Sequence, residues 1–273
     1  MNYQKAKVPD KEYLKKVVER QRKALNESLE YAQYIQKALM PKKEKVNDLF
    51  PDNFVYFLPR DLVSGDFFWV RQLREKSILA VGDCTGHGVP GAFMSILGIT
   101  FLNEITNHEP LLSANRILNS MRERIMKTLD QTGKKFEVKD GMDLALIIFD
   151  QKTNILQFAG AKNPLYHFHN GALNEIRGDR MPIGVYALFE SSFTNHQIHM
   201  QEGDRVYLFT DGYVDQLGGP NFKKFKFQSF RNLLSDIQSY DLTKQQELLD
   251  KEFNKWKGEF EQVDDILIIG IGF

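Results

Sequence analysis

The fold is decided by Val81-Gly82-Asp83-Cys84-Thr85-Gly86-His87-Gly88-Val89-Pro90-Gly91-Ala92. An apolar run before this stretch delivers an aspartate into a glycine-rich loop, and a helix-forming segment begins at Pro90. Because glycine has no Cβ and tolerates positive φ, backbone carbonyls in such a loop can approach a ligand closely. A strand, an anionic turn and a helix in this order suit a hard cation. Asp and Gly are also the residues that any ordinary turn prefers. The loop alone is therefore compatible with a cation site and with a turn that has no ligand.

Composition describes a neutral chain with enough apolar residues for a sizeable core. It has 273 residues, of which 42% are hydrophobic and 26% charged, and Lys+Arg and Asp+Glu both number 36. A net charge of zero gives no bulk field for nucleic acid or an anionic membrane surface. The single cysteine excludes an intramolecular disulfide and fits a reducing compartment. No segment approaches the about 18 apolar residues of a membrane span, and residues 1–10 lack the apolar core of a signal peptide. We therefore expect a soluble cytoplasmic protein without a nucleic acid partner or membrane insertion.

The N-terminal segment predicts one long helix. Residues 11–40 contain no glycine or proline, and Pro41 ends the helix because the residue before a proline disfavours helical geometry. Small and apolar positions recur at spacings of four and three, with polar interruptions at Gln21 and Ser28. This seam either pairs two copies in a homodimer or folds back onto its own domain. We divide the chain into a helical, coiled-coil or regulatory linker at 1–45 and a compact domain at 46–273.

Alternation and turn signals place the remaining elements. The first three strands read as one antiparallel meander, and the uniformly apolar run at 142–149 reads as a central strand. Helices grouped in sequence, without regular βαβ alternation, predict an α/β fold of antiparallel sheets covered by helices on their outer faces. Strands are predicted at 54–58, 67–73, 77–81, 142–149, 155–159, 165–169, 172–176, 205–210 and 266–273, and helices at 89–107, 113–131, 229–239 and 243–257.

Aspartates stand at the edges of several of these strands. Because strand ends converge at the rim of a sheet, we expect the carboxylates to lie close together, where they repel one another unless a cation neutralises them. Oxygen ligands without a Cys/His cluster select Mg²⁺ or Mn²⁺. Two such ions about 3.5–4 Å apart activate water and stabilise in-line attack on phosphorus. The pattern predicts metal-dependent phosphoester hydrolysis, and the residues that carry it are Asp66, Asp83, Asp211 and either Asp264 or Asp265.

Six motifs now on the page occur together and in order. The chain from about Phe54 to Phe273 resembles the stage II sporulation protein E-like branch of the PPM metal-dependent serine/threonine phosphatases. That resemblance implies an αββα sandwich with two Mn²⁺ or Mg²⁺ ions in a cleft at one end of the sheets. The motifs are Ser64-Gly65-Asp66-Phe67-Phe68, the stretch from Gly82 to Ala92, Phe158-Ala159-Gly160-Ala161-Lys162-Asn163-Pro164, Pro182-Ile183-Gly184, Leu208-Phe209-Thr210-Asp211-Gly212 and Asp264-Asp265-Ile266.

The resemblance also implies individual roles. Asp83 matches the carboxylate that bridges both metals, and the carbonyl of Cys84 is a neighbouring ligand. Asp66 matches the first acidic motif, where it binds through its carboxylate or through water. The other implied metal ligands are Asp211 and Asp264, with Asp265 as the alternate.

One position departs from the eukaryotic relatives. Thr85 stands where those proteins carry a histidine proposed as the general acid, and His87 does not match it by spacing. The proton donor to the leaving group is therefore left open, and His87 receives a structural role in the loop.

The function implied is that of a Mn²⁺/Mg²⁺-dependent serine/threonine phosphoprotein phosphatase, in which a metal-activated hydroxide attacks the phosphoseryl or phosphothreonyl ester without a covalent intermediate. By the same resemblance, the expected substrate is a phosphorylated anti-sigma-factor antagonist or a similar regulatory protein in bacterial partner switching. The alternatives are a non-catalytic phosphoprotein-binding scaffold and a small-molecule phosphomonoesterase. An intact set of acidic positions argues against the scaffold.

Three basic residues are candidate substrate contacts. Arg60 precedes the first acidic motif and either holds a phosphate or is an ordinary solvated loop arginine. Lys223 and Lys224 lie in a stretch that interleaves bases with aromatics, a pattern also found in single-strand nucleic-acid binding. On a neutral chain we prefer docking of the protein substrate.

Other conspicuous side chains receive no catalytic role. His167 and His169 alternate on one strand and share a face, but without a third ligand in view they read as ordinary strand histidines. The Cys84 thiol has no His and Asp/Asn pattern to support a nucleophile. Asp143, inside the central strand, is left unexplained.

Overall fold

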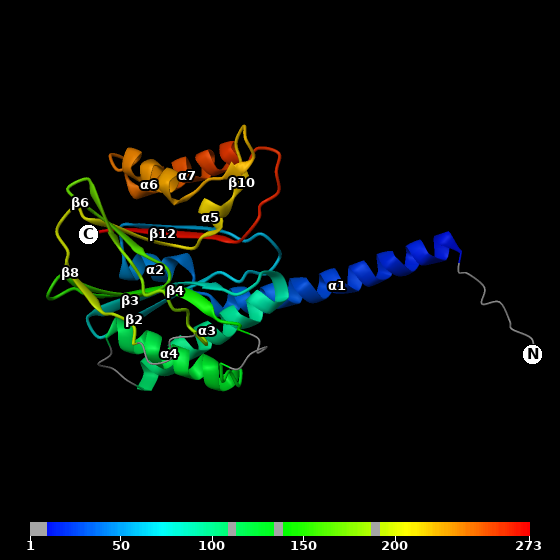
Figure 1. Cartoon of the computed structure of the whole chain (residues 1–273), viewed down its shortest axis with the longest axis horizontal. Coiled ribbons are helices and arrows are strands. Elements are labelled where there is room, and N and C mark those ends of the chain that lie inside the picture. The colour runs from blue at the N-terminus through cyan, green and yellow to red at the C-terminus, as the bar shows by residue number, and fades with distance from the viewer. Residues whose placement is uncertain (1–9, 109–112, 134–138, 187–191) are drawn as a thin grey trace, which may run out of the picture.

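The computed structural model describes residues 10–108, 113–133, 139–186 and 192–273 (Figure 1). Two five-stranded sheets are stacked face to face, and every pair of neighbouring strands in them is antiparallel. The first sheet, in the order β1-β12-β9-β6-β7, comprises β1 (Asn53–Leu58), β6 (Leu165–His169), β7 (Ala172–Ile176), β9 (Arg205–Phe209) and β12 (Ile266–Gly272). The second, in the order β2-β3-β4-β5-β8, comprises β2 (Phe67–Leu73), β3 (Lys76–Cys84), β4 (Met142–Asp150), β5 (Ile155–Ala161) and β8 (His196–His199).

Helices cover both outer faces, so the αββα sandwich implied by the resemblance is confirmed (Figure 1). One pair of helices lies along the second sheet and another pair along the first. The helices are α1 (Lys11–Leu39), α2 (Lys43–Leu49), α3 (Gly88–His108), α4 (Ala114–Thr128), α5 (Gly212–Asp215), α6 (Phe227–Asp236) and α7 (Leu242–Lys257), and a short hairpin joins β10 (Leu217–Gly218) to β11 (Lys223–Lys224).

Three apolar layers hold the sandwich together. The central strand β4 shows why these layers form, because both of its faces are covered and its sequence is therefore apolar from Leu144 to Phe149. Leu144 and Leu146 face the layer under α3 and α4, whereas Ala145 and Ile147 face the layer between the sheets. The third layer, between the first sheet and α6 and α7, is rich in aromatic side chains.

The first three strands do not form the predicted meander. β2 and β3 are a hairpin, but β1 pairs with β12 in the other sheet. β1 buries Phe54 and Tyr56 in one layer and packs Val55 and Phe57 against another, so both of its faces are covered although it is the edge strand of its sheet. The order of the strands along the chain could not reveal that the chain passes from one sheet to the other between β1 and β2. The short elements α2 and β8 were not predicted, and part of the expected connection at 132–141 lies outside the described residues.

The predicted N-terminal helix is present as α1. It begins after Asp10, whose carboxylate accepts the N–H of Glu12 at 3.4 Å, and it ends before Pro41. It extends away from the sandwich (Figure 1), and the seam residues Leu14, Val18 and Leu25 are 46%, 61% and 59% exposed.

Helix α3 is more apolar than the sequence analysis allowed. Within the described ranges, α3 is the one helix that is long and apolar enough to cross a membrane by length and composition, although no such segment was expected. Half of its most apolar window is buried, against the second sheet and α4. Its apolarity is that of a core helix.

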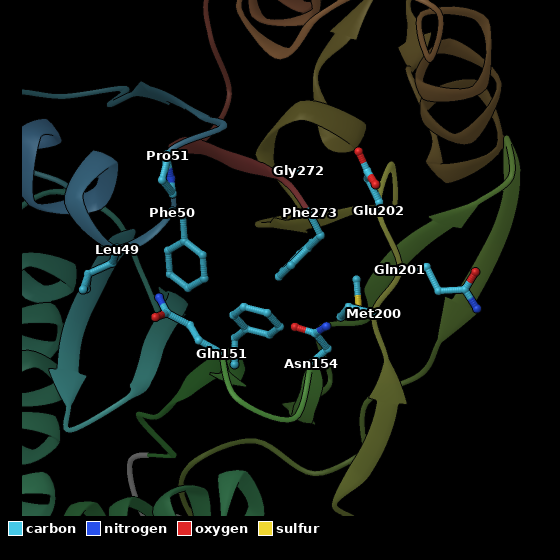
Figure 2. A pocket seen from close by; sticks show the side chains of 11 residues that line it. Leu49, Phe50, Pro51, Gln151, Asn154, Met200, Gln201, Glu202, Gly272 and Phe273 are labelled. Atoms are coloured by element: carbon cyan, nitrogen blue, oxygen red, sulfur yellow. The ribbon is translucent and has the colours of Figure 1, made fainter.

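The two ends of the sandwich differ in chemistry. At the end where β3 starts and β12 finishes, an apolar pocket of about 320 Å³ opens (Figure 2). Phe50, Met200 and Phe273 point into it, whereas Glu202 points away. The opposite end carries the aspartates.

Candidate active site

Strand direction gathers the predicted aspartates at one end of the sandwich. In the second sheet β2 starts and β3 finishes at this end, so Asp66 and Asp83 meet there. In the first sheet β9 finishes and β12 starts there, which adds Asp211 and the Asp264-Asp265 pair. Antiparallel neighbours alternate direction, and an aspartate placed before one strand and after the next therefore reaches the same rim.

A polar cleft of about 220 Å³ lies between these strand ends. Its lining residues are Asp83, Cys84, Thr85, Gly86, His87, Asp143, Lys162, Asp211 and Asp264. The structure thus brings four of the predicted site residues into one cavity. Asp66 and Asp265 lie behind this lining, 2% and 3% exposed.

Asp66 is held in place by the Thr-Asp-Gly motif. The Thr210 hydroxyl donates to Asp66 Oδ2 at 2.6 Å, and Thr210 Oγ1 accepts the N–H of Leu267 at 3.0 Å. The threonine therefore ties the first acidic motif to β12. Sequence reasoning assigned it no role.

The two closing aspartates have different surroundings. Asp265 accepts the backbone N–H of Arg60 with Oδ1 at 2.7 Å and that of Gly65 with Oδ2 at 2.8 Å. Asp264 lines the cleft, and its Oδ1 accepts the N–H of Asp265 at 2.9 Å. The geometry favours Asp264 over Asp265 as a cation ligand, because both carboxylate oxygens of Asp265 already accept hydrogen bonds from the loop that precedes Asp66.

Close packing of the motif glycines joins the two acidic loops. A Cβ on Gly65 would lie 2.7 Å from the carbonyl oxygen of Gly86, and a Cβ on Gly91 would overlap the same oxygen. Gly86 itself has φ +83°, a conformation that side chains disfavour. The loop carrying Asp83 can lie against the loop carrying Asp66 only with glycine at these positions.

Burial and mutual repulsion raise the pKa values of the carboxylates. Burial, reinforced by Asp211 and Asp264, raises the pKa of Asp83 to about 9. Burial, with the charge of Asp83 next, also places the pKa of Asp66 well above its usual range. The pKa of Asp211 rises to about 6 through burial, then through Asp215 and Asp264. Ionisation of these carboxylates is therefore unfavourable unless a cation lies among them.

Two lining residues had no assigned function in the sequence. Asp143 stands opposite Asp83 in the β3–β4 register, and Lys162 Nζ lies 3.0 Å from Asp143 Oδ1. Burial raises the pKa of Asp143, and the hydrogen bond from Lys162 opposes that shift. Asp143 was visible as a charged residue inside an apolar strand. The signal for Lys162 was its place in the Ala-Lys-Asn-Pro turn, where it adopts φ +59°.

The basic candidates lie outside the cleft lining. The Arg60 guanidinium pairs with Asp61 at 2.6 Å, contacts His87 Nδ1 and donates to the carbonyl of Val263 at 3.1 Å. Lys223 and Lys224 are exposed on β11, and Lys224 Nζ lies 2.7 Å from Asp215 Oδ2.

The donor set fits hard divalent cations. It consists of carboxylate and carbonyl oxygens in a polar cleft, with burial and repulsion disfavouring the unneutralised carboxylates. The residues able to hold such ions are Asp66, Asp83, Asp211, Asp264 and the carbonyl of Cys84.

An αββα sandwich with this acidic cleft defines the class as a PP2C-type, metal-dependent protein-serine/threonine phosphatase. A family model described as Stage II sporulation protein E (SpoIIE) matches residues 74–273, and the chain belongs to this family. A comparison with curated proteins finds no match.

Solved structures agree with this assignment. The SiaA-PP2C domain of Pseudomonas aeruginosa is 30% identical, with a TM-score of 0.82 over 93% of this chain and 98% of that one. The phosphatase domain with a regulatory fragment of SpoIIE from Bacillus subtilis is 18% identical, with a TM-score of 0.65 over 81% of this chain and 61% of that one. The RsbU and RsbW domains of Rv1364c from Mycobacterium tuberculosis are 20% identical, with a TM-score of 0.62 over 81% and 59%. The last two share the fold.

Proposed function

We propose that the protein hydrolyses phosphoserine or phosphothreonine in a small regulatory protein, using two Mn²⁺ or Mg²⁺ ions. The observation that carries this proposal is the convergence of Asp83, Asp211 and Asp264 on one polar cleft, where burial and mutual repulsion raise the pKa of Asp83 to about 9. A carboxylate that is unfavourable alone, at the centre of an oxygen-only cleft, is suited to a bound cation. The proposed ligands are Asp66, Asp83, Asp211, Asp264 and the Cys84 carbonyl.

Bound divalent ions would supply charge neutralisation for the phosphoryl group and an activated water for direct attack on phosphorus. The chain itself positions the groups around them. Thr210 orients Asp66, and Asp265 holds the loop from Arg60 to Gly65. Lys162 offsets the charge of Asp143 at the wall of the cleft. We assign Asp265 this positioning role and Asp264 the ligand role.

His87 and Arg60 form the rim of the site. The imidazole Nδ1 of His87 is engaged by Arg60 and lies 3.5 Å from Asp61, which supports a role in shaping the loop. Arg60 is close enough to this rim to meet a phosphate, although its guanidinium is held by Asp61. We propose Arg60 as a substrate contact that exchanges its Asp61 partner for the phosphorylated side chain.

The substrate class is proposed to be a phosphorylated anti-sigma-factor antagonist or a similar domain in partner switching. Support comes from the family, and from a structural relative that carries RsbU and RsbW domains in one protein. Lys223 and Lys224 stand exposed on β11, where Lys224 reaches Asp215, an acidic neighbour of Asp211. We propose that this lysine pair docks the protein substrate beside the cleft.

The N-terminal part, 1–45, is proposed to regulate the catalytic domain at 46–273. Gln36 is the buried residue of α1, and its Nε2 donates to the Ser64 carbonyl at 2.6 Å and to Ser95 Oγ at 2.9 Å. Ser64 N–H returns a bond to Gln36 Oε1 at 3.1 Å. Ser64 begins the motif that carries Asp66. A partner that moves α1 would therefore shift the position of Asp66 through the hydrogen bonds between Gln36 and Ser64.

Hydrolysis assays test the chemistry. We expect wild-type protein to cleave a phosphothreonine peptide and an aryl phosphate with Mn²⁺ or Mg²⁺ but not with chelator, and Asp83→Asn to lose at least about 100-fold in rate. Asp48→Asn, an exposed helical position, is the matched control and should retain full activity. Metal bound by the wild type without turnover of any phosphoester would indicate that an activating partner is required, whereas a wild type that binds no metal would support the scaffold instead.

The same assay separates docking from chemistry. Replacing Lys223 and Lys224 with alanine should weaken hydrolysis of a phosphoprotein and spare the aryl phosphate, since neither lysine lines the cleft. An equal loss on both substrates would contradict the docking role.

A further inference from the structure

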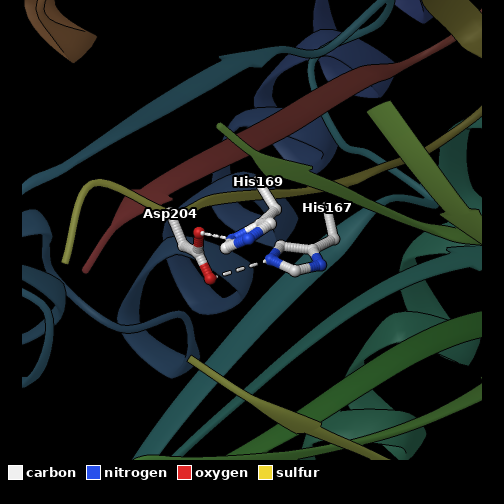
Figure 3. A group of neighbouring side chains, drawn as sticks. All are labelled: His167, His169 and Asp204. Atoms are coloured by element: carbon white, nitrogen blue, oxygen red, sulfur yellow. Dashed lines mark hydrogen bonds and ion pairs between the residues drawn. The ribbon is translucent and has the colours of Figure 1, made fainter. Parts of the chain in front are cut away.

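Two histidines and an aspartate form a cluster at the end of the sandwich opposite to the acidic cleft (Figure 3). His167 and His169 come from β6, and Asp204 comes from the turn before β9. His167 Nε2 lies 3.0 Å from Asp204 Oδ2, and His169 Nδ1 lies 2.7 Å from Asp204 Oδ1. One potential ligand atom from each residue lies within 4.8 Å of the other two. These three residues are called the distal cluster below.

Sheet register explains why the three side chains meet. β6 and β9 pair antiparallel with His167 opposite Val206, and the same register brings Asp204 opposite His169. Opposed residues, and residues two apart on a strand, share a face of the sheet. Leu165 and Val206 on this face belong to the apolar layer between the sheets. The distal cluster is therefore the polar rim of that layer.

Two of the three side chains in the distal cluster are buried, as expected for a binding site with fixed geometry and not for a group of solvated surface residues. Asp204 is 1% and His167 7% exposed, and Asp204 Oδ2 also accepts the N–H of Gln201 at 3.0 Å. The Asp204 carboxylate thus faces two imidazole nitrogens. The His169 side chain is 33% exposed, which gives an ion a path from solvent.

A partner for the outer nitrogen of His169 is already present. Asn170 Nδ2 lies 3.0 Å from His169 Nε2. A histidine that binds metal through one nitrogen carries its proton on the other, and a neighbouring acceptor fixes this tautomer. With its side-chain amide rotated, Asn170 would present its oxygen to Nε2–H and leave the Nδ1 lone pair free for a cation.

We propose that His167, His169 and Asp204 bind one divalent d-block cation of the Zn²⁺ type, with the remaining coordination completed by solvent on the exposed side of His169. Two imidazole nitrogens with one carboxylate oxygen suit Zn²⁺, Co²⁺ or Ni²⁺ better than Mg²⁺ or Mn²⁺. The acidic cleft has the opposite preference, because its donors are oxygens alone. The two ends of the sandwich thus select different metals.

The ion would link β6 to the turn before β9, and this turn is already bonded to the end of the chain just after β12. His167 and His169 belong to β6, Asp204 leads into β9, and the Asp204 carbonyl accepts the N–H of Phe273 just after β12 at 2.9 Å. A ligand that binds only the folded state stabilises it by mass action. At 100 times its dissociation constant, Zn²⁺ should raise Tm by about 5–10 °C.

Metal titration of the 273-residue chain tests this proposal. We would measure Zn²⁺ binding by calorimetry and Co²⁺ binding by visible absorption in an Asp83→Asn background, which weakens the acidic cleft. We expect one Zn²⁺ equivalent and an intense Co²⁺ band typical of nitrogen-ligated, low-coordinate cobalt. His169→Ala should lower the affinity by more than the roughly 10–100-fold typical of losing an outer-shell partner. His199→Ala, at an exposed strand histidine on β8, is the matched control and should bind as the background does.

Two results would overturn the proposal: unchanged Zn²⁺ affinity in His169→Ala, or no nitrogen-ligated Co²⁺ band in the background protein. Asp204→Asn should also lose binding, but this residue is buried and bonds the turn at Gln201, so its folding must be checked by circular dichroism. His169→Ala decides the matter in either case, because this side chain is partly exposed and its removal opens no core cavity.

Discussion

Asp264 and Asp265 are adjacent and chemically identical, yet their contacts give them different tasks. Asp265 is almost fully buried, and both of its oxygens accept backbone N–H groups from the loop before Asp66. Asp264 faces the cleft, and burial, followed by the charge of Asp265, raises its pKa against the hydrogen bond from the Asp265 N–H. A side chain that satisfies buried donors contributes to folding, whereas one with unneutralised charge in a cleft is suited to a ligand.

The variants Asp264→Asn and Asp265→Asn should therefore differ in stability and in Mn²⁺ binding. Asp265→Asn places an amide where a backbone N–H needs an acceptor, and we expect it to lower the free energy of unfolding by about 1–3 kcal/mol. Asp264→Asn should not lower that free energy in metal-free buffer, because it removes a charge that repels Asp83 and Asp211, and it should weaken Mn²⁺ binding. Urea unfolding and Mn²⁺ titration of both variants measure the two effects. A larger loss of stability in Asp264→Asn than in Asp265→Asn would reverse our assignment.

At the scale of elements, α1 has a free apolar seam and a fixed end. Leu14, Val18 and Leu25 are exposed along most of its length, while Gln36 is bonded to Ser64 and Ser95. The helix has few tertiary contacts in its first half, so little of its stability there comes from packing on its own domain. A second copy of α1 is the partner that its heptad spacing fits best.

We expect the protein to dimerise through α1. Val18→Glu and Leu25→Glu should each raise the dimer dissociation constant about 10–100-fold, because each places a charge in the buried seam. Asn26→Glu, exposed and off the seam, is the matched control. Sedimentation over a range of concentrations measures the constant. Wild-type protein that sediments as a monomer throughout would assign the seam to a different partner.

Sequence patterns within single segments predicted most helices and strands, and they predicted that the aspartates gather at one end of the sandwich. An aspartate flanking an apolar strand must lie at a sheet edge, so Asp83 and Asp211 could be placed from sequence. Pairing across the fold leaves no such trace, which is why β1 was put in the wrong sheet. The third member of the distal cluster was hidden for the same reason, because Asp204 reaches His169 only through the β6–β9 register.

Considered as a whole, the metal-free molecule should become less stable as pH rises. Burial and repulsion raise the pKa of Asp83 to about 9 and that of Asp211 to about 6 in the folded state, whereas an unfolded aspartate titrates near about 3.9. The folded state then binds more protons than the unfolded state, so the free energy of unfolding falls with pH. Asp211 contributes to this fall between about pH 4 and 6, and Asp83 between about pH 4 and 9.

Thermal unfolding in chelator across this pH range should therefore show Tm falling toward alkaline pH, and saturating Mg²⁺ should flatten the curve because cations replace the protons. Asp83→Asn isolates the contribution of one carboxylate from all other titrations of the chain. We expect this variant to have a shallower slope and a Tm several degrees above wild type near pH 8 in chelator, while lacking phosphatase activity. Parallel curves for the two proteins in chelator would show that Asp83 keeps an ordinary pKa, and would remove the electrostatic support for a cation at that carboxylate.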